Sequence, residues 1–250
     1  MRVALSVSVI VSFITLILFL MHYNRKLSIT LDKKLFFKCF NKIFELLINA
    51  TPLFISSFAY LFLNNIQKFA IDRYLTESEQ AAFGYIIMPV FVIPLLSSFV
   101  IQPALVSVTN AYNRKKYGVF NKSIRNNILF LLAMLLVCEF GAFVAGVPVL
   151  NMIYKTNLAM YKYDLQIILL GGSFLALANY MSVLLTIMRL QKLSMYIYLV
   201  GAVIGAGSAY VFTCRYGIHG SSFSYLVTVF VTSVLFVATF FLAYKKALKR

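Results

Sequence analysis

The sequence predicts an all-α membrane protein that crosses the bilayer seven times. Hydrophobic residues make up 62% of the 250 residues and charged residues only 12%, whereas soluble proteins carry about 45–50% and about 25%. A helix of about 20 apolar residues crosses the hydrocarbon core of a membrane. Once such segments are removed, no soluble domain remains. The predicted spans are Val3–Tyr23, Ile43–Asn64, Ala81–Val108, Ile128–Leu150, Leu165–Met188, Leu193–Cys214 and Ser221–Ala243.

The basic residues lie in the gaps between these spans and indicate the orientation of the chain. The net charge is +16, and 17 of the 23 lysines and arginines fall on the same side of the membrane as the gap Arg25–Lys42. Lysine and arginine concentrate in cytoplasmic loops. We therefore expect the N-terminus outside and the C-terminus in the cytoplasm, and we expect no nucleic-acid partner.

The first span, Val3–Tyr23, predicts a retained helix rather than a secretory signal. Its apolar run is longer than the 7–15 residues of a signal core, only Arg2 precedes it, and no small-residue cleavage site follows.

Two other classes with several membrane helices are disfavoured. Asp72-Arg73-Tyr74 spells a tripeptide of rhodopsin-like receptors, but it follows the second span on the side poor in lysine and arginine. His22 and His219 lie at opposite membrane faces, no protease or hydrolase motif occurs, and the three cysteines have no metal-binding spacing. We expect no enzyme activity, no cofactor and no metal.

Prolines and glycines inside the spans predict bends in the helices. Proline removes a backbone donor and clashes with the preceding turn, and two adjacent glycines weaken a helix by about 2 kcal/mol relative to alanine. Transporters bind their substrates where membrane helices are broken, although such residues can also serve only to shape packing. The hinge candidates are Pro52, Pro94, Pro103, Gly171 and Gly172.

Glu139 lies near the centre of the span Ile128–Leu150. A charged carboxylate at this depth costs at least about 2.5–3.5 kcal/mol, so it must face water, pair with a base or stay protonated. We identify Glu139 as a candidate for ion coupling, with a neutral hydrogen bond between helices as the structural alternative.

The end of the second span carries amides and charges of both signs. Lys68 and Asp72 are four residues apart, a spacing at which they can pair on one helix face. If the helix continues through this stretch, Lys68 and Arg73 bring positive charge to the mouth of a cavity, where they can attract a lipid phosphate.

The order of residues between Lys38 and Tyr117 resembles that of the bacterial polysaccharide and O-antigen flippases. These flippases belong to the multidrug/oligosaccharidyl-lipid/polysaccharide exporter superfamily. The resemblance rests on placement along successive helices, and the rest of the chain agrees in helix number and length. The matching run is Pro52, Asn65-x-x-Lys68-x-x-Ile71-Asp72-Arg73, Ala82-Phe83-Gly84-Tyr85, Gln102-Pro103-Ala104 and Tyr112.

The resemblance implies a division of the chain into three parts. Residues 1–23 correspond to the last helix of a first lobe, residues 24–42 to a basic cytoplasmic connector, and residues 43–250 to a six-helix C-terminal lobe. Family members have 12 or more helices in two lobes, and this chain has seven predicted spans. The resemblance therefore implies that most of one lobe is missing.

The resemblance also implies a function and a set of partners. The family moves undecaprenyl-diphosphate-linked oligosaccharide across the bacterial cytoplasmic (inner) membrane for surface polysaccharide and lipopolysaccharide O-antigen synthesis. The partners implied are membrane lipids, a separately encoded N-terminal lobe or a homodimer, and the polymerase and glycosyltransferases of the pathway. The cavity candidates are Lys68, Arg73, Asn64, Gln67 and Gln102, with Arg125 and Arg189 as weaker candidates that can equally be membrane anchors.

Two other functions remain open at this point. A multidrug exporter of the same superfamily would extrude a cation and would favour acidic cavity residues, of which the chain offers Glu139. A non-transporting assembly subunit or an inactive remnant is the other alternative, and the missing lobe supports it.

Overall fold

The computed structural model describes residues 11–19 and 33–248, and all its regular elements are helices. Five helical stretches in this part of the chain are long and apolar enough to cross a membrane. The predicted first span is described only at residues 11–19, and part of the predicted connector lies outside the described residues. The five stretches are Lys42–Tyr74, Glu77–Phe99, Tyr117–Tyr154, Ala159–Ile187 and Gln191–Ala247.

The chain forms two units, Met1–Ala50 and Thr51–Arg250. Within the first unit, residues 11–19 are helical and all their side chains are exposed. Helix α2 runs from Lys33 to Tyr74 and crosses the boundary between the units. The second unit holds the remainder of α2 and all later helices.

The predicted span Ala81–Val108 is built from three consecutive helical segments. Helix α3 (Glu77–Ile87) begins with a capping box, in which the Thr76 hydroxyl accepts from the Glu79 backbone while the Glu79 carboxylate accepts from the Thr76 backbone. The 3₁₀ segment η1 (Met88–Phe91) contains Pro89 and leads into α4 (Val92–Asn113). The missing proline donor accounts for the tighter turn at this point.

The next span also contains an irregular segment. Helix α5 (Tyr117–Gly141) continues into a π-helical segment, η2 (Ala142–Gly146), and then into α6 (Val147–Tyr154). A short 3₁₀ segment, η3 (Ala159–Tyr161), precedes α7 (Lys162–Ile187).

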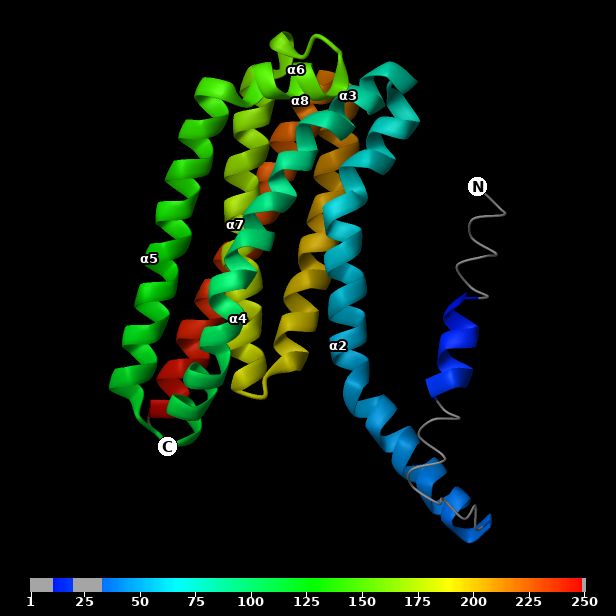
Figure 1. The fold of residues 1–250 in the computed structure, drawn as a ribbon, viewed down its shortest axis with the longest axis vertical. Coiled ribbons are helices and arrows are strands. Elements are labelled where there is room, and N and C mark those ends of the chain that lie inside the picture. The colour runs from blue at the N-terminus through cyan, green and yellow to red at the C-terminus, as the bar shows by residue number, and fades with distance from the viewer. Residues whose placement is uncertain (1–10, 20–32, 249–250) are drawn as a thin grey trace. The chain divides into compact units, whose positions relative to one another are not determined.

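Helix α7 forms the centre of the second unit and packs against α4, α5 and α8 (Gln191–Leu248) (Figure 1). Its buried residues lie on several faces, as expected of a helix inside a bundle. Gly171 and Gly172 allow the neighbouring elements to approach closely. A Cβ atom on Gly171 would lie 2.8 Å from the Tyr225 ring, and one on Gly172 would lie 2.7 Å from the Val90 side chain.

Helix α8 is two helices joined at Gly217, whose φ of 60° and ψ of −135° are not helical. Glycine adopts positive φ without the steric penalty of a side chain. Hydroxyls on either side of Gly217 meet, with 2.9 Å between the Oγ atoms of Ser208 and Ser224 and 2.7 Å between the buried Thr213 Oγ1 and Ser221 Oγ. The two halves therefore run side by side as a hairpin (Figure 1), and Gly217 falls between the last two predicted spans.

Candidate functional site

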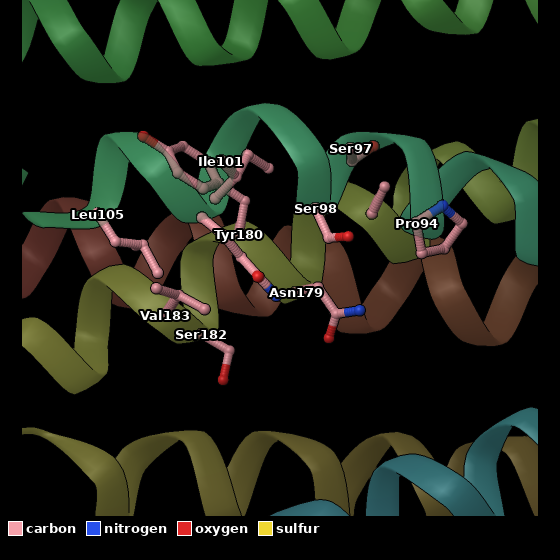
Figure 2. Close-up of a pocket in the computed structure, with 11 residues that line it drawn as sticks. Pro94, Ser97, Ser98, Ile101, Leu105, Asn179, Tyr180, Ser182 and Val183 are labelled. Carbon is pink, nitrogen blue, oxygen red and sulfur yellow. The ribbon is translucent and has the colours of Figure 1, made fainter.

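A pocket of about 270 Å³ lies between α4 and α7 in the second unit (Figure 2). The α4 residues that line it recur every three to four positions, which is the spacing of one helix face. The α4 wall consists of Pro94, Ser97, Ser98, Ile101, Gln102 and Leu105, and the α7 wall consists of Ala176, Asn179, Tyr180, Ser182 and Val183.

The pocket wall is mainly apolar by area, with hydroxyl and amide groups set into it and no charged side chain. Six of its eleven residues bear a hydroxyl or amide, and none is acidic or basic. The Ser97 hydroxyl donates to the Ile93 carbonyl at 2.7 Å, and the Ser98 hydroxyl donates to the Leu95 carbonyl at 2.6 Å. Because these donors are used within α4, the serine oxygens face a ligand mainly as acceptors.

Two adjacent residues of the α7 wall connect the pocket to three other helices. The Asn127 amide of α5 donates to the Tyr180 hydroxyl at 2.9 Å. The Asn179 amide donates to the Tyr60 hydroxyl of α2 at 3.0 Å, and the Asn179 carbonyl accepts from the Tyr198 hydroxyl of α8 at 3.1 Å. These bonds fix the orientation of polar groups that would be costly if left unpaired in the bundle.

The predicted cavity residues lie in different places. Gln102 and the hinge candidate Pro94 line the pocket. Lys68 is half-buried, with its Nζ 6.0 Å from the centre of the Phe91 ring. Arg73 is exposed near the end of α2, and its guanidinium lies 6.0 Å from the Tyr74 ring. A role for these residues in substrate binding stays a prediction.

Two predicted amides are buried on α2 and incompletely bonded. The Asn64 amide donates to the Tyr60 carbonyl at 2.8 Å, but its Oδ1 atom has no hydrogen-bond partner within the described protein. Gln67 is fully buried, and neither its Oε1 nor its Nε2 atom has a partner there. Buried amides of this kind require water or another ligand for their hydrogen bonds.

Lys68 and Asp72, whose spacing allows an ion pair, do not form one in the described residues. Asp72 instead accepts a hydrogen bond from Gln80 at 3.3 Å, and Lys68 lies near Phe91. Across residues 11–19 and 33–248, the contact between an acidic and a basic side chain joins Asp164 Oδ2 to His219 Nδ1 at 2.7 Å, and it is an ion pair when the histidine is protonated. An exposed lysine–aspartate pair gains too little free energy to hold two long side chains against such alternatives.

Glu139 occupies the last turn of α5, directly before the π segment η2. Its side chain is half-buried, and its Oε1 atom is buried without a hydrogen-bond partner in the described part of the chain. π segments occur frequently at functional sites. Glu139 does not line the pocket between α4 and α7. Any ion bound by Glu139 would therefore lie outside this pocket, and ion coupling by Glu139 stays a prediction.

The hinge candidates show different local structures. Pro52 and Pro103 lie inside α2 and α4, which continue through them. Gly171 and Gly172 lie in an unbroken α7 at close contacts with neighbouring side chains. These contacts give the two glycines a packing role, whereas the predicted hinge role remains untested.

Sequence reasoning missed the α7 wall of the pocket and the partner of His219. Asn179 and Tyr180 lie inside the predicted span Leu165–Met188, where an amide is unusual and could have indicated a site. His219 had been interpreted as standing alone. Its partner Asp164 is distant in the sequence, and no local pattern connects the two residues.

The fold and the pocket define a helical protein with several helices long and apolar enough to cross a membrane, and with an uncharged pocket between two helices that carries hydroxyl and amide groups. No group of three or more histidine, cysteine, aspartate or glutamate side chains suited to a metal ion occurs in the described residues. Comparison of the chain with family models, with curated proteins and with solved structures gives no match.

Proposed function

We propose that this chain forms one helical bundle of a transporter that moves undecaprenyl-diphosphate-linked oligosaccharide across the bacterial cytoplasmic membrane. The pocket between α4 and α7 is the observation that carries the proposal. Hydroxyl and amide groups inside a membrane bundle are costly and usually functional. An uncharged wall of such groups suits the hydroxyls of a sugar better than it suits a free ion.

The position of Lys68 gives the same proposal a site for the diphosphate. Lys68 lies near the ring of Phe91, and Phe91 precedes the pocket residue Pro94 by one helical turn. We therefore infer that a positive charge lies near one end of the uncharged pocket. In the proposal, Lys68 attracts the diphosphate and the pocket receives the sugar, with Arg73 as an outer contact.

We further propose that transport requires a second helical bundle, either a separately encoded lobe or another copy of this chain. Gln102 lines the pocket and is exposed, and lipid cannot satisfy its amide. Alternating access requires two bundles that move around a shared cavity. The predicted orientation, with the N-terminus outside and the C-terminus in the cytoplasm, and the predicted seven spans belong to this proposal.

Complementation of a flippase-null strain tests the proposed function, with surface polysaccharide as the readout. We expect rescue when the chain is expressed with the neighbouring reading frame or as a dimer, and none from a demonstrable monomer. In the rescuing form, the double substitution Ser98→Leu and Gln102→Leu should lower transport about tenfold or more, because it removes two polar contacts worth about 1 kcal/mol each.

Phe99→Leu is the matched control, because Phe99 lies on the same helix and is 69% exposed. It should leave rescue unchanged. Transport at the wild-type rate by the Ser98→Leu, Gln102→Leu variant would contradict the assignment of the pocket to the substrate. Full rescue by a monomer would contradict the need for a second bundle.

A second prediction concerns ion coupling by Glu139. Glu139→Gln resembles the neutral acid, so we expect normal folding and expression but no dependence of transport on the proton gradient. Glu77→Gln, at an exposed position on α3, serves as the control and should keep the dependence. Wild-type dependence in Glu139→Gln would leave this carboxylate with a structural role.

The buried, unpartnered oxygen of Glu139 also favours the alternative of a cation exporter. A carboxylate without a fixed partner can bind a proton or an organic cation in turn. Efflux of a fluorescent lipophilic cation from vesicles distinguishes the two functions. Efflux that Glu139→Gln abolishes, together with failure of complementation, would favour the exporter.

A further inference from the structure

Asn179 is the pocket residue that contacts both α2 and α8. Its Nδ2 atom donates to the Tyr60 hydroxyl at 3.0 Å, and its Oδ1 atom accepts from the Tyr198 hydroxyl at 3.1 Å. The two tyrosine rings also pack edge to face, with their centres 5.6 Å apart. Asn179 therefore occupies the junction of three helices and the wall of the pocket at once.

The part of α2 that belongs to the second unit packs less closely against the other helices than α4, α5 and α8 pack against α7. Its contacts with α8 occur where glycine permits them. A Cβ on Gly201 would lie 3.0 Å from Leu63, and one on Gly205 would lie 3.5 Å from Ile66. Leu63, Ile66 and Ile71 of α2 are nevertheless fully buried, so the Tyr60 hydrogen bond adds to this apolar contact and favours one position of α2 within it.

Tyr198 is held differently from Tyr60. Tyr198 is 3% exposed, and its ring packs edge to face on Phe236 with the centres 4.7 Å apart. Tyr60 is only half-buried. Of the two partners of Asn179, Tyr60 is therefore the one that can be displaced more readily.

We propose that Asn179 couples occupancy of the pocket to the position of α2, because a sugar hydroxyl that bonds to the Asn179 amide replaces the Tyr60 hydroxyl. Tyr60 is bonded to the amide nitrogen and Tyr198 to the amide oxygen, so a sugar hydroxyl that takes the hydrogen now donated to Tyr60 breaks that bond and leaves the bond to Tyr198 in place. The release of Tyr60 lets α2 move away from α7. This coupling rests on the proposed function in that the ligand is a sugar-bearing lipid.

Electron–electron distance measurement in lipid nanodiscs tests this coupling. Spin labels are placed at Phe58 on α2 and Leu132 on α5, which are 66% and 53% exposed, in a variant whose native cysteines are replaced. The probes are undecaprenyl diphosphate carrying a disaccharide and undecaprenyl diphosphate without sugar, and the binding of each is measured separately. We expect the sugar-bearing probe to shift the distance distribution and the bare lipid to leave it unchanged.

Tyr60→Phe keeps the ring and removes the hydroxyl. It should show the shifted distribution without any probe, and it should bind the sugar-bearing probe about fivefold more tightly, since no hydrogen bond of about 1 kcal/mol has to be displaced. Tyr198→Phe is the matched control. It removes the other partner of Asn179, keeps the bond to Tyr60 and should still respond to the probe.

Each outcome decides one of the two proposals. Binding of the sugar-bearing probe with an unchanged distribution in the unsubstituted chain would overturn the coupling and leave the proposed function intact. An unshifted distribution in Tyr60→Phe would also overturn the coupling. Failure of both lipids to bind would overturn the proposed function, and the coupling with it.

Discussion

Gly220→Ala is expected to destabilise the hairpin of α8 by about 3 kcal/mol or more. A Cβ atom at this position would meet the backbone carbonyl of Phe212, on the other half of the hairpin, well inside any normal contact distance. Overpacking typically costs about 1–3 kcal/mol, and here a backbone must shift rather than a flexible side chain. The measurement is unfolding of the purified protein in mixed micelles as the denaturing detergent increases.

Gly207→Ala provides the matched control in the same helix. A Cβ on Gly207 would find no other atom within 4 Å, so the stability should stay the same or rise slightly, because alanine favours the helix by up to about 1 kcal/mol. Equal stability of Gly220→Ala and Gly207→Ala would show that the two halves of α8 do not approach as closely as described.

His219→Ala is expected to lower the stability by about 2 kcal/mol. The Asp164 side chain is 1% exposed, whereas that of His219 is 64% exposed. Removal of His219 therefore leaves a buried carboxyl group without its partner, and loss of a hydrogen bond to a charged group costs about 1.5–3 kcal/mol. Because solvent screens the exposed histidine, the lower part of this range is expected.

A double-mutant cycle with Asp164→Asn separates the ion pair from general packing. In the Asp164→Asn background, His219→Ala should cost much less, because no buried charge remains to be left unpaired. Arg215→Ala removes an exposed cation close in sequence and should have little effect. An equal cost of His219→Ala in both backgrounds would show that the pair contributes nothing specific.

The helical class and the positions of the apolar helices were predictable because they depend on local properties of the sequence. The predicted spans from Ile43 onward fall on helical segments to within a residue, and five helical stretches are long and apolar enough to cross a membrane. The break at Gly217 falls in the short polar gap between the last two predicted spans. The sequence showed where a helix can break but not that both halves would pair through buried hydroxyls.

The candidate site was only partly predictable. Gln102 and Pro94 were recognised on α4 as a rare amide and a proline within an apolar span. The α7 wall of the pocket was not recognised. A pocket forms between two helices, and the periodicity of one helix does not reveal which other helix it faces. The ion pair that the spacing of Lys68 and Asp72 allows does not form, for the same reason. Lys68 instead lies near Phe91, and Asp72 accepts a hydrogen bond from Gln80.

The sequence by itself therefore determined the composition, the predicted orientation and the position of the apolar segments, all of which follow from the cost of placing polar groups in hydrocarbon. The tertiary structure alone decided which polar groups meet. Asp164 contacts His219, and Asn179 forms hydrogen bonds with Tyr60 and Tyr198. Such pairs form because buried polar groups must be satisfied by whatever the packing of the helices brings within reach, and this packing depends on side-chain shapes far apart in the sequence.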